Sequence, residues 1–254
     1  MSKFDRKKFR EELRKKEQEA LDKDPYQDFE GSSTELFFLK LGHLIAKYKF
    51  IVLGVLIGLV LVLSIVIGVD EYLKHKFEVA TIEIEKIEKS HSKDPSITPD
   101  KKIEDLENFL KEHDIKSLKV RVSKVLSSLY AEKKDFAKAA EYMEIAASNI
   151  QDVKEVQAYF YYTAGNYFEN SENIKKAMES YSSASNLISE NKELPNLNAM
   201  VLYGLARMKI KEGQKDSAIS DLKKILEIES KYEGPILTEI KQTSTYLILK
   251  LNKG

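Results

Sequence analysis

The sequence predicts an all-α protein, with a single transmembrane helix followed by a solenoid of helix pairs. Two observations carry this prediction. Residues 50–69 read FIVLGVLIGLVLVLSIVIGV and hold no charged side chain, although 32% of the 254 residues are Asp, Glu, Lys or Arg. After this stretch, apolar residues recur every three or four positions in segments separated by short turns, which is typical of helices buried along one side.

A charged tail precedes the apolar stretch. Residues 1–31 mix acidic and basic side chains almost evenly, so we expect a solvated, partly disordered segment. Ser32 and Glu35 then match a capping box. This pattern predicts an amphipathic juxtamembrane segment over residues 32–49.

Residues 50–69 have the length and composition of a membrane-spanning helix. At about 1.5 Å per residue they reach roughly 30 Å, the thickness of the hydrocarbon core of a bilayer. A helix that is apolar on every side would otherwise need a large protein around it. Gly54 and Gly58 have the spacing of a close helix–helix contact, which allows a homodimer; the alternative is two unrelated glycines.

Basic residues set the predicted orientation. The first 49 residues carry 12 Lys or Arg. Short basic tails stay in the cytoplasm, whereas long domains cross largely regardless of charge. We therefore expect a single-pass protein of the cytoplasmic (inner) membrane, with its N-terminus in the cytoplasm and its larger C-terminal region outside.

Residues 70–114 are predicted to continue the helix out of the membrane and to form a degenerate leading helix pair. Residues 90–99 read SHSKDPSITP and predict the loop between the two helices. A 4-3-4-3 spacing gives the first helix one apolar seam, made of Leu73, Phe77, Ala80, Ile84 and Ile87.

Residues 115–234 contain three segments with a shared layout of two helices. Ala or Gly at a crossing point lets two helices approach closely, and bulky residues fill the flanking grooves. The middle segment shows this pattern best, through Tyr161, Ala164, Gly165, Phe168, Ala177, Tyr181 and Ala184. The layout resembles the tetratricopeptide repeat, which implies three repeats of an α-solenoid and a protein–protein interaction module.

The resemblance has two departures. The aligned alanines Ala139, Ala177 and Ala218 are more widely spaced than the family's repeat, and no copy ends in the usual proline. We therefore expect longer turns and an irregular superhelix. Pro235 is expected to begin a closing helix within residues 235–254, because the last repeat would otherwise expose its core face.

The order of charged tail, single span, helical extension and repeats also resembles the YfgM-like proteins, a bacterial inner-membrane family that forms an ancillary subunit of the Sec translocon. This resemblance is one of layout and depends on no diagnostic residue string. It implies a place in the bacterial envelope and a partner among translocon or envelope proteins.

Aligning the repeats assigns a set of side chains to the family's partner-binding groove. Tyrosine together with basic and amide side chains suits an extended or helical peptide. The alternative is that the tyrosines pack between helices, as predicted for Tyr161. The predicted groove residues are Arg121, Lys124, Tyr159, Tyr162, Asn166, Asn170, Met200, Tyr203, Arg207 and Lys211.

The sequence has no catalytic or metal-binding motif. Cysteine is absent, which excludes a thiolate nucleophile and a Cys-ligated zinc. No two histidines among His43, His75, His91 and His113 have i,i+3 or i,i+4 spacing. We expect no enzymatic activity, cofactor or metal, and a net charge of zero argues against nucleic-acid binding.

These observations predict a membrane-anchored interaction module that holds a partner polypeptide at the membrane and assists protein translocation or envelope assembly. Two alternatives remain open. One is a single-span transmembrane regulator whose charged N-terminal tail binds a cytoplasmic factor. The other is a self-associating structural scaffold.

Overall fold

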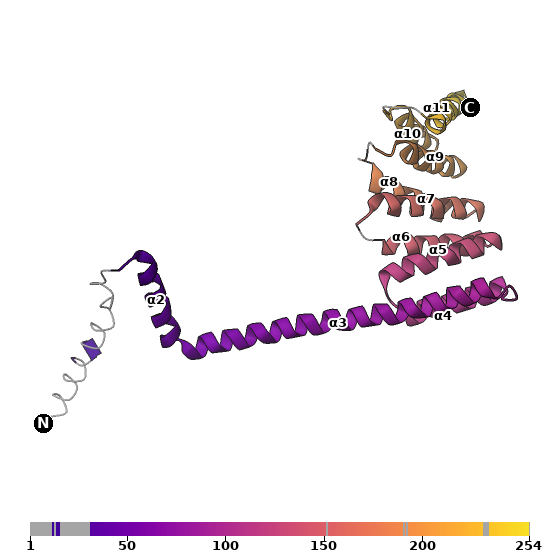
Figure 1. The fold of residues 1–254 in the computed structure, drawn as a ribbon. Coiled ribbons are helices and arrows are strands. Elements are labelled where there is room, and N and C mark those ends of the chain that lie inside the picture. Colours follow the sequence, from indigo (N-terminus) through magenta and orange to yellow (C-terminus); the bar gives the residue numbers. More distant parts are fainter. Residues whose placement is uncertain are drawn as a thin grey trace, which may run out of the picture. The chain divides into compact units, whose positions relative to one another are not determined.

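The computed structural model describes residues 12, 14, 15, 31–150, 152–189, 191, 193–230 and 234–253. Over these residues the protein is all-helical, without a strand, which confirms the predicted class (Figure 1). The chain divides into two units, Met1–Leu73 and Lys74–Gly254. The predicted charged tail, residues 1–31, falls almost entirely outside the described residues.

Helix α2 (Ser33–Lys47) begins where the sequence predicts. The Ser32 hydroxyl accepts a hydrogen bond from the Glu35 backbone N–H at 3.3 Å, and the Glu35 carboxylate accepts one from the Ser32 N–H at 3.0 Å. This reciprocal pair is the predicted capping box, and it satisfies two backbone donors that a helix start leaves unpaired. The helix buries no side chain, and Phe37 and Phe38 are exposed.

Helix α3 (Lys49–Lys93) contains the whole uncharged stretch. Among the described helices it is the one long and apolar enough to cross a membrane, judged by length and composition. None of the side chains of residues 50–69 is buried. An apolar surface of this length needs lipid or another apolar partner to cover it.

The loop predicted over residues 90–99 is wrong at its start, because α3 continues to Lys93. Ser90 and Ser92 donate hydrogen bonds to the backbone carbonyls of Ile87 and Glu88, which fits a helical backbone. The helix ends just before Pro95, which disfavours helical geometry at the residue that precedes it.

Helix α4 (Pro99–Glu112) packs on the C-terminal part of α3 in one core cluster. Ala80 and Ile84 of the predicted seam are fully buried there, and Ile87 is partly buried. Leu73 and Phe77 are exposed instead, so the protein-covered seam is shorter than predicted. The reason is length: α4 has 14 residues and covers only the end of the 45-residue α3.

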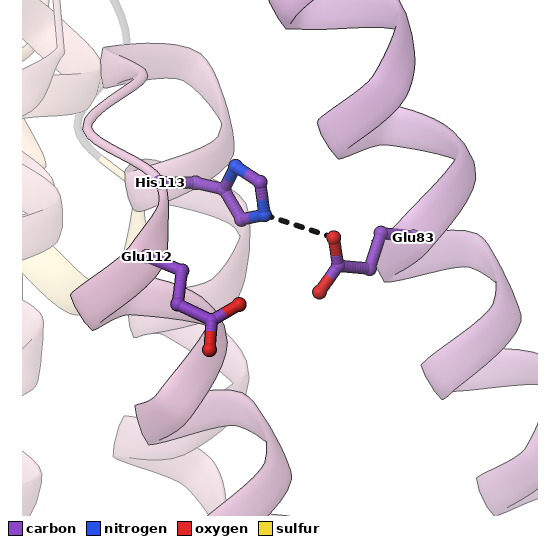
Figure 2. A group of neighbouring side chains, drawn as sticks. All are labelled: Glu83, Glu112 and His113. Carbon is purple, nitrogen blue, oxygen red and sulfur yellow. Dashed lines mark hydrogen bonds and ion pairs between the residues drawn. The ribbon is translucent and has the colours of Figure 1, made fainter.

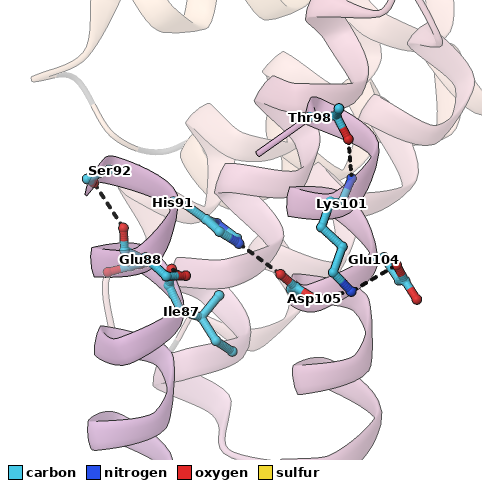
Figure 3. Close-up of polar contacts among 9 residues, drawn as sticks. Ile87, Glu88, His91, Ser92, Thr98, Lys101, Glu104 and Asp105 are labelled. Carbon is cyan, nitrogen blue, oxygen red and sulfur yellow. Dashed lines mark hydrogen bonds and ion pairs between the residues drawn. The ribbon is translucent and has the colours of Figure 1, made fainter. Parts of the chain in front are cut away.

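Polar contacts fasten α4 at its first turn and along its side (Figure 3). The Thr98 hydroxyl caps α4 by accepting from the Lys101 backbone N–H at 3.3 Å. Asp105 lies 3.1 Å from His91 Nε2 of α3 and 3.0 Å from Lys101 Nζ. The contact between His91 and Asp105 joins the two helices next to their connecting loop.

The rest of the chain forms helices that pack on their neighbours in chain order. This arrangement is consistent with a tetratricopeptide-like solenoid, and the final helix begins at Pro235 as predicted. The predicted segment boundaries themselves stay predictions. The helices are α5 (Lys116–Glu132), α6 (Phe136–Asn149), α7 (Lys154–Asn170), α8 (Ile174–Ile188), α9 (Pro195–Lys211), α10 (Lys215–Leu226) and α11 (Pro235–Lys253).

Helices α5 to α10 form three consecutive pairs, α5–α6, α7–α8 and α9–α10. The turns that join the two helices of each pair share one backbone conformation. Each contains a residue with positive φ: Lys134 at 61°, Glu172 at 60° and Gly213 at 75°. The next residue donates its N–H to the carbonyl five positions earlier, as in a Schellman motif. These bonds run from Asp135 to Tyr130, from Asn173 to Phe168 and from Gln214 to Lys209, at 2.9, 2.9 and 2.8 Å. The three turns therefore repeat one backbone conformation at the places where the sequence predicts equivalent turns.

Candidate partner-binding face on α7 and α9

Helices α7 and α9 are the first helices of the second and third pairs, and they contact each other. They carry eight of the ten predicted groove residues. The eight have the same spacing on both helices, in steps of three, four and four, which puts each set on one face. They are Tyr159, Tyr162, Asn166 and Asn170 on α7, and Met200, Tyr203, Arg207 and Lys211 on α9.

A glutamate joins the two faces. Glu169 Oε2 accepts a hydrogen bond from Arg207 Nη2 at 2.7 Å, and its Oε1 lies 3.5 Å from Lys211 Nζ. The Arg207 guanidinium also stacks over the Tyr203 ring, 5.0 Å from its centre. Three of the predicted α9 residues, Tyr203, Arg207 and Lys211, are thus positioned together. Glu169, which contacts Arg207 and Lys211, was not among the predicted residues.

Tyr181 of α8 packs between α7 and α9 and so holds the two helices of this face in position. Its ring lies against Gly165 of α7 and Gly204 of α9, where an added Cβ would come within 2.6 and 2.7 Å of ring atoms. Its hydroxyl lies 2.7 Å from Asn166 Oδ1 and 3.1 Å from Glu169 Oε2. Glycine at both positions is therefore required for the ring to fit between the helices.

The hydroxyl of Tyr181 acts as a hydrogen-bond donor. Burial raises the pKa of this phenol well above its usual value, and the nearby Glu169 carboxylate raises it further, against an opposing effect of Arg207. The phenol therefore keeps its proton and donates toward Asn166 and Glu169. The predicted burial of the middle segment is confirmed here, since Ala164, Gly165, Phe168, Ala177, Tyr181 and Ala184 are all buried.

The other end of the face is apolar. Tyr159 of α7 and Met200 of α9 line one open and mainly apolar pocket of about 280 Å³. Five residues at the start of α9 complete the lining, namely Glu193, Leu194, Pro195, Asn196 and Leu197. Tyr159 is 52% exposed. The face thus combines an accessible apolar pocket with the Glu169 network, which consists of Glu169, Asn166, Tyr181, Arg207 and Lys211.

The remaining predicted residues are placed differently. Arg121 on α5 pairs with Glu88 of α3, with its Nε 3.0 Å from the carboxylate. Lys124 is exposed on α5, and Asn170 is exposed at the end of α7. These three lie outside the Glu169 network, so the structure does not bring the two α5 residues, or Asn170 at the end of α7, together with the other predicted residues.

Tyr161 and Tyr162 bear on the alternative in which the tyrosines pack between helices. Tyr162 is half-buried, with its ring 6.0 Å from that of Tyr181, and Tyr161 packs against a buried cluster of α7, α8 and α9. Both tyrosines therefore fit that alternative, whereas Tyr159 does not. Glu169 could have been predicted from its spacing, because it falls three residues after Asn166 on the same helix.

A second glutamate–tyrosine cluster ties α4 to the first pair. Glu107 accepts hydrogen bonds from Tyr130 at 2.6 Å and Tyr142 at 2.8 Å, and the two rings stack 5.5 Å apart. Burial raises the pKa of Glu107, but the two hydroxyls, together with the positive charges of Lys138 and Lys111, lower it overall. Burial, with the Glu107 carboxylate, raises the pKa of Tyr130 to about 12. The cluster joins three helices and has a structural role.

Comparison with models of known protein families gives a match over part of the chain. Residues 200–232 match the family model described as a tetratricopeptide repeat. Over these residues the chain is tetratricopeptide-like. The match covers most of α9, all of α10 and the residues just beyond, within the third segment predicted from the sequence. No curated protein matches the chain.

This match bears on function at a coarse level. Tetratricopeptide repeats commonly bind protein partners, and such repeats in an all-helical fold usually mean a non-enzymatic interaction module. The matched segment contains Met200, Tyr203, Arg207 and Lys211. The α9 half of the candidate face therefore lies within the repeat.

Proposed function

We propose that the protein is a membrane-anchored interaction module that binds a partner polypeptide across α7 and α9. One observation carries this proposal: Tyr159 and Met200, from successive first helices, share an open apolar pocket at one end of the face. Side chains of a partner contribute most to binding where they fill a desolvated pocket. The partner would place an apolar side chain in this pocket.

The Glu169 network orders two basic side chains. Arg207 and Lys211 both contact Glu169, so one carboxylate offsets only one of their two positive charges before a partner arrives. An amphipathic segment therefore fits this face, with its polar groups against the remaining positive charge. Tyr203 and Arg207 are already stacked, so a partner loses less entropy in ordering them.

The length and composition of α3 support the membrane anchor. We place the protein in the cytoplasmic (inner) membrane with its N-terminus inside, on the basis of the 12 basic residues before the span. Tethering restricts the module to the membrane surface and raises its effective concentration for partners there. From the YfgM-like layout, those partners would be translocon or envelope proteins.

Site-specific photocrosslinking tests the binding face. A photoreactive amino acid at Tyr159 should yield a protein adduct in cells, whereas the same group at Tyr246 should not. Tyr246 is a matched control, since it is an exposed tyrosine, 62% accessible, on the closing helix α11. Equal adducts at both positions, or none at Tyr159, would contradict the proposed face.

A topology reporter fused after Gly254 tests the proposed location. An active periplasmic reporter supports an outside location of the repeats, and an active cytoplasmic reporter removes the link to envelope partners. Deleting residues 2–31 tests the alternative of a transmembrane regulator. Function that survives this deletion would contradict the regulator, because the regulator requires its tail to bind a cytoplasmic factor.

A further inference from the structure

Three side chains with metal-binding atoms meet where α3 and the end of α4 lie together (Figure 2). They are Glu83 of α3, Glu112 of α4 and His113, the residue that caps α4. One ligand atom from each lies within 4.8 Å of the other two. His113 Nε2 and Glu83 Oε2 are 2.9 Å apart.

Packing holds the backbones of these residues in place. Glu83 directly precedes Ile84, which is fully buried. The His113 ring lies 4.6 Å from the ring of Phe109, which is itself 1% exposed. Ile84 and Phe109 belong to the same core cluster. Two ligands from different helices are thus anchored in one core, which limits the rearrangement that metal binding would require.

The donor set matches zinc chemistry. Zinc takes imidazole nitrogen and carboxylate oxygen at about 2.0–2.2 Å in a tetrahedron, which separates ligand atoms by about 3.3 Å. The three ligand atoms lie within 4.8 Å of one another, and His113 Nε2 and Glu83 Oε2 would move apart from 2.9 Å to reach that separation. Calcium and magnesium prefer oxygen ligands throughout, so the imidazole favours a transition metal.

The charges also suit a dication. The two carboxylates would balance a charge of +2 when the imidazole is neutral. Glu112 and His113 are at the C-terminal end of α4, where the unpaired carbonyls of a helix favour a cation. Glu112 is exposed, which leaves access from solvent and room for a water ligand.

We propose that Glu83, Glu112 and His113 bind one zinc-class dication, with water in the fourth position. The metal would tie α3 to the C-terminal end of α4 and replace the direct contact between His113 and Glu83. The proposal concerns α3 and α4 alone and stands independently of the partner-binding face. Sequence spacing does not reveal such a site, because Glu83 and His113 are 30 residues apart.

Zinc titration of the full chain in detergent, after removal of metal with a chelator, tests this site. We expect one zinc ion per chain by calorimetry and a higher unfolding temperature with zinc, because a ligand that binds only the folded state stabilises it. His113→Ala and Glu112→Gln should each weaken zinc binding by about tenfold or more. Glu112→Gln also guards against misfolding, because it leaves the His113–Glu83 contact intact.

His91→Ala is the matched control. His91 also contacts a carboxylate across the same two helices, but Lys101 occupies the space beside Asp105 and would repel a cation (Figure 3). This variant should bind zinc as the unaltered chain does. The proposal is overturned if the chain binds no zinc, or if Glu112→Gln and His113→Ala bind it as tightly as His91→Ala. Binding of calcium in preference to zinc would equally overturn it.

Discussion

Two pairs of helix glycines in this protein have opposite surroundings. A Cβ added at Gly54 or Gly58 of α3 would meet no described atom within 4 Å outside the helix's own nearby backbone. A Cβ added at Gly165 or Gly204 would lie within 2.7 Å of the Tyr181 ring. The same residue type therefore marks an open surface in one region and a filled crossing in the other. A glycine in a sequence indicates that another group can approach the backbone closely at that position. Only the packed structure shows whether a group does so.

Removal of the Tyr181 ring, which lies between Gly165 and Gly204, should have the largest effect on stability. Tyr181→Ala would leave a cavity between α7, α8 and α9, and we expect a loss of about 3–5 kcal/mol in the free energy of unfolding. Chemical denaturation of the full chain in detergent measures it. Tyr246→Ala, at an exposed tyrosine, should change stability by no more than about 0.5 kcal/mol. Similar losses for the two variants would show that the ring is not packed as described.

One substitution made in both glycine pairs tests the comparison directly. Gly204→Val should lower the unfolding free energy by about 1–3 kcal/mol, because the new side chain overlaps the Tyr181 ring. Gly58→Val should leave the stability of the repeats unchanged. The same denaturation measurement serves for both. The comparison fails if Gly204→Val is as stable as Gly58→Val.

A smaller effect is expected from the hydroxyl of Tyr181. Tyr181→Phe keeps the ring between the glycines but removes the donor that faces Asn166 and Glu169, at a cost of about 1 kcal/mol. Comparison with Tyr181→Ala separates packing from hydrogen bonding. A loss as large as that of Tyr181→Ala would mean that the hydrogen bonds, rather than the ring, hold the helices together.

The smallest effect is expected from Gly58→Ile. If the protein works as an interaction module, the mass of the protein–detergent particle should be the same with and without this substitution, by analytical ultracentrifugation. A dimer that dissociates on Gly58→Ile would instead support the self-associating scaffold. In that case the open surface at Gly54 and Gly58 is where the second copy packs.

Local patterns predicted much of the fold. Ser32 and Glu35 define the start of α2, Pro235 defines the start of α11, and Ala164, Gly165 and Phe168 are buried as their spacing indicates. Each of these features depends on residues close together in the chain. The end of α3 was predicted less well, because its polar last turn reads as a loop while its serines bond to the helix backbone.

The candidate site depends on contacts between distant residues. The spacing of Tyr159, Asn166, Met200 and Arg207 put each on a shared helix face, but it did not show that Glu169 bonds to Arg207 or that Arg121 pairs with Glu88. The close approach of Gly204 to Tyr181 was also missed. These partners lie on different helices, so their meeting depends on how the helices pack rather than on any local pattern.

The central claim is that a partner binds in the pocket shared by Tyr159 and Met200. Its most direct test is the yield of the photocrosslinked adduct at Tyr159 in cells carrying Met200→Asp, compared with cells carrying the unaltered residue. A charge in an apolar pocket should oppose an apolar side chain of the partner, so we predict that the adduct is lost while the protein level stays the same. An adduct of undiminished yield would contradict the claim.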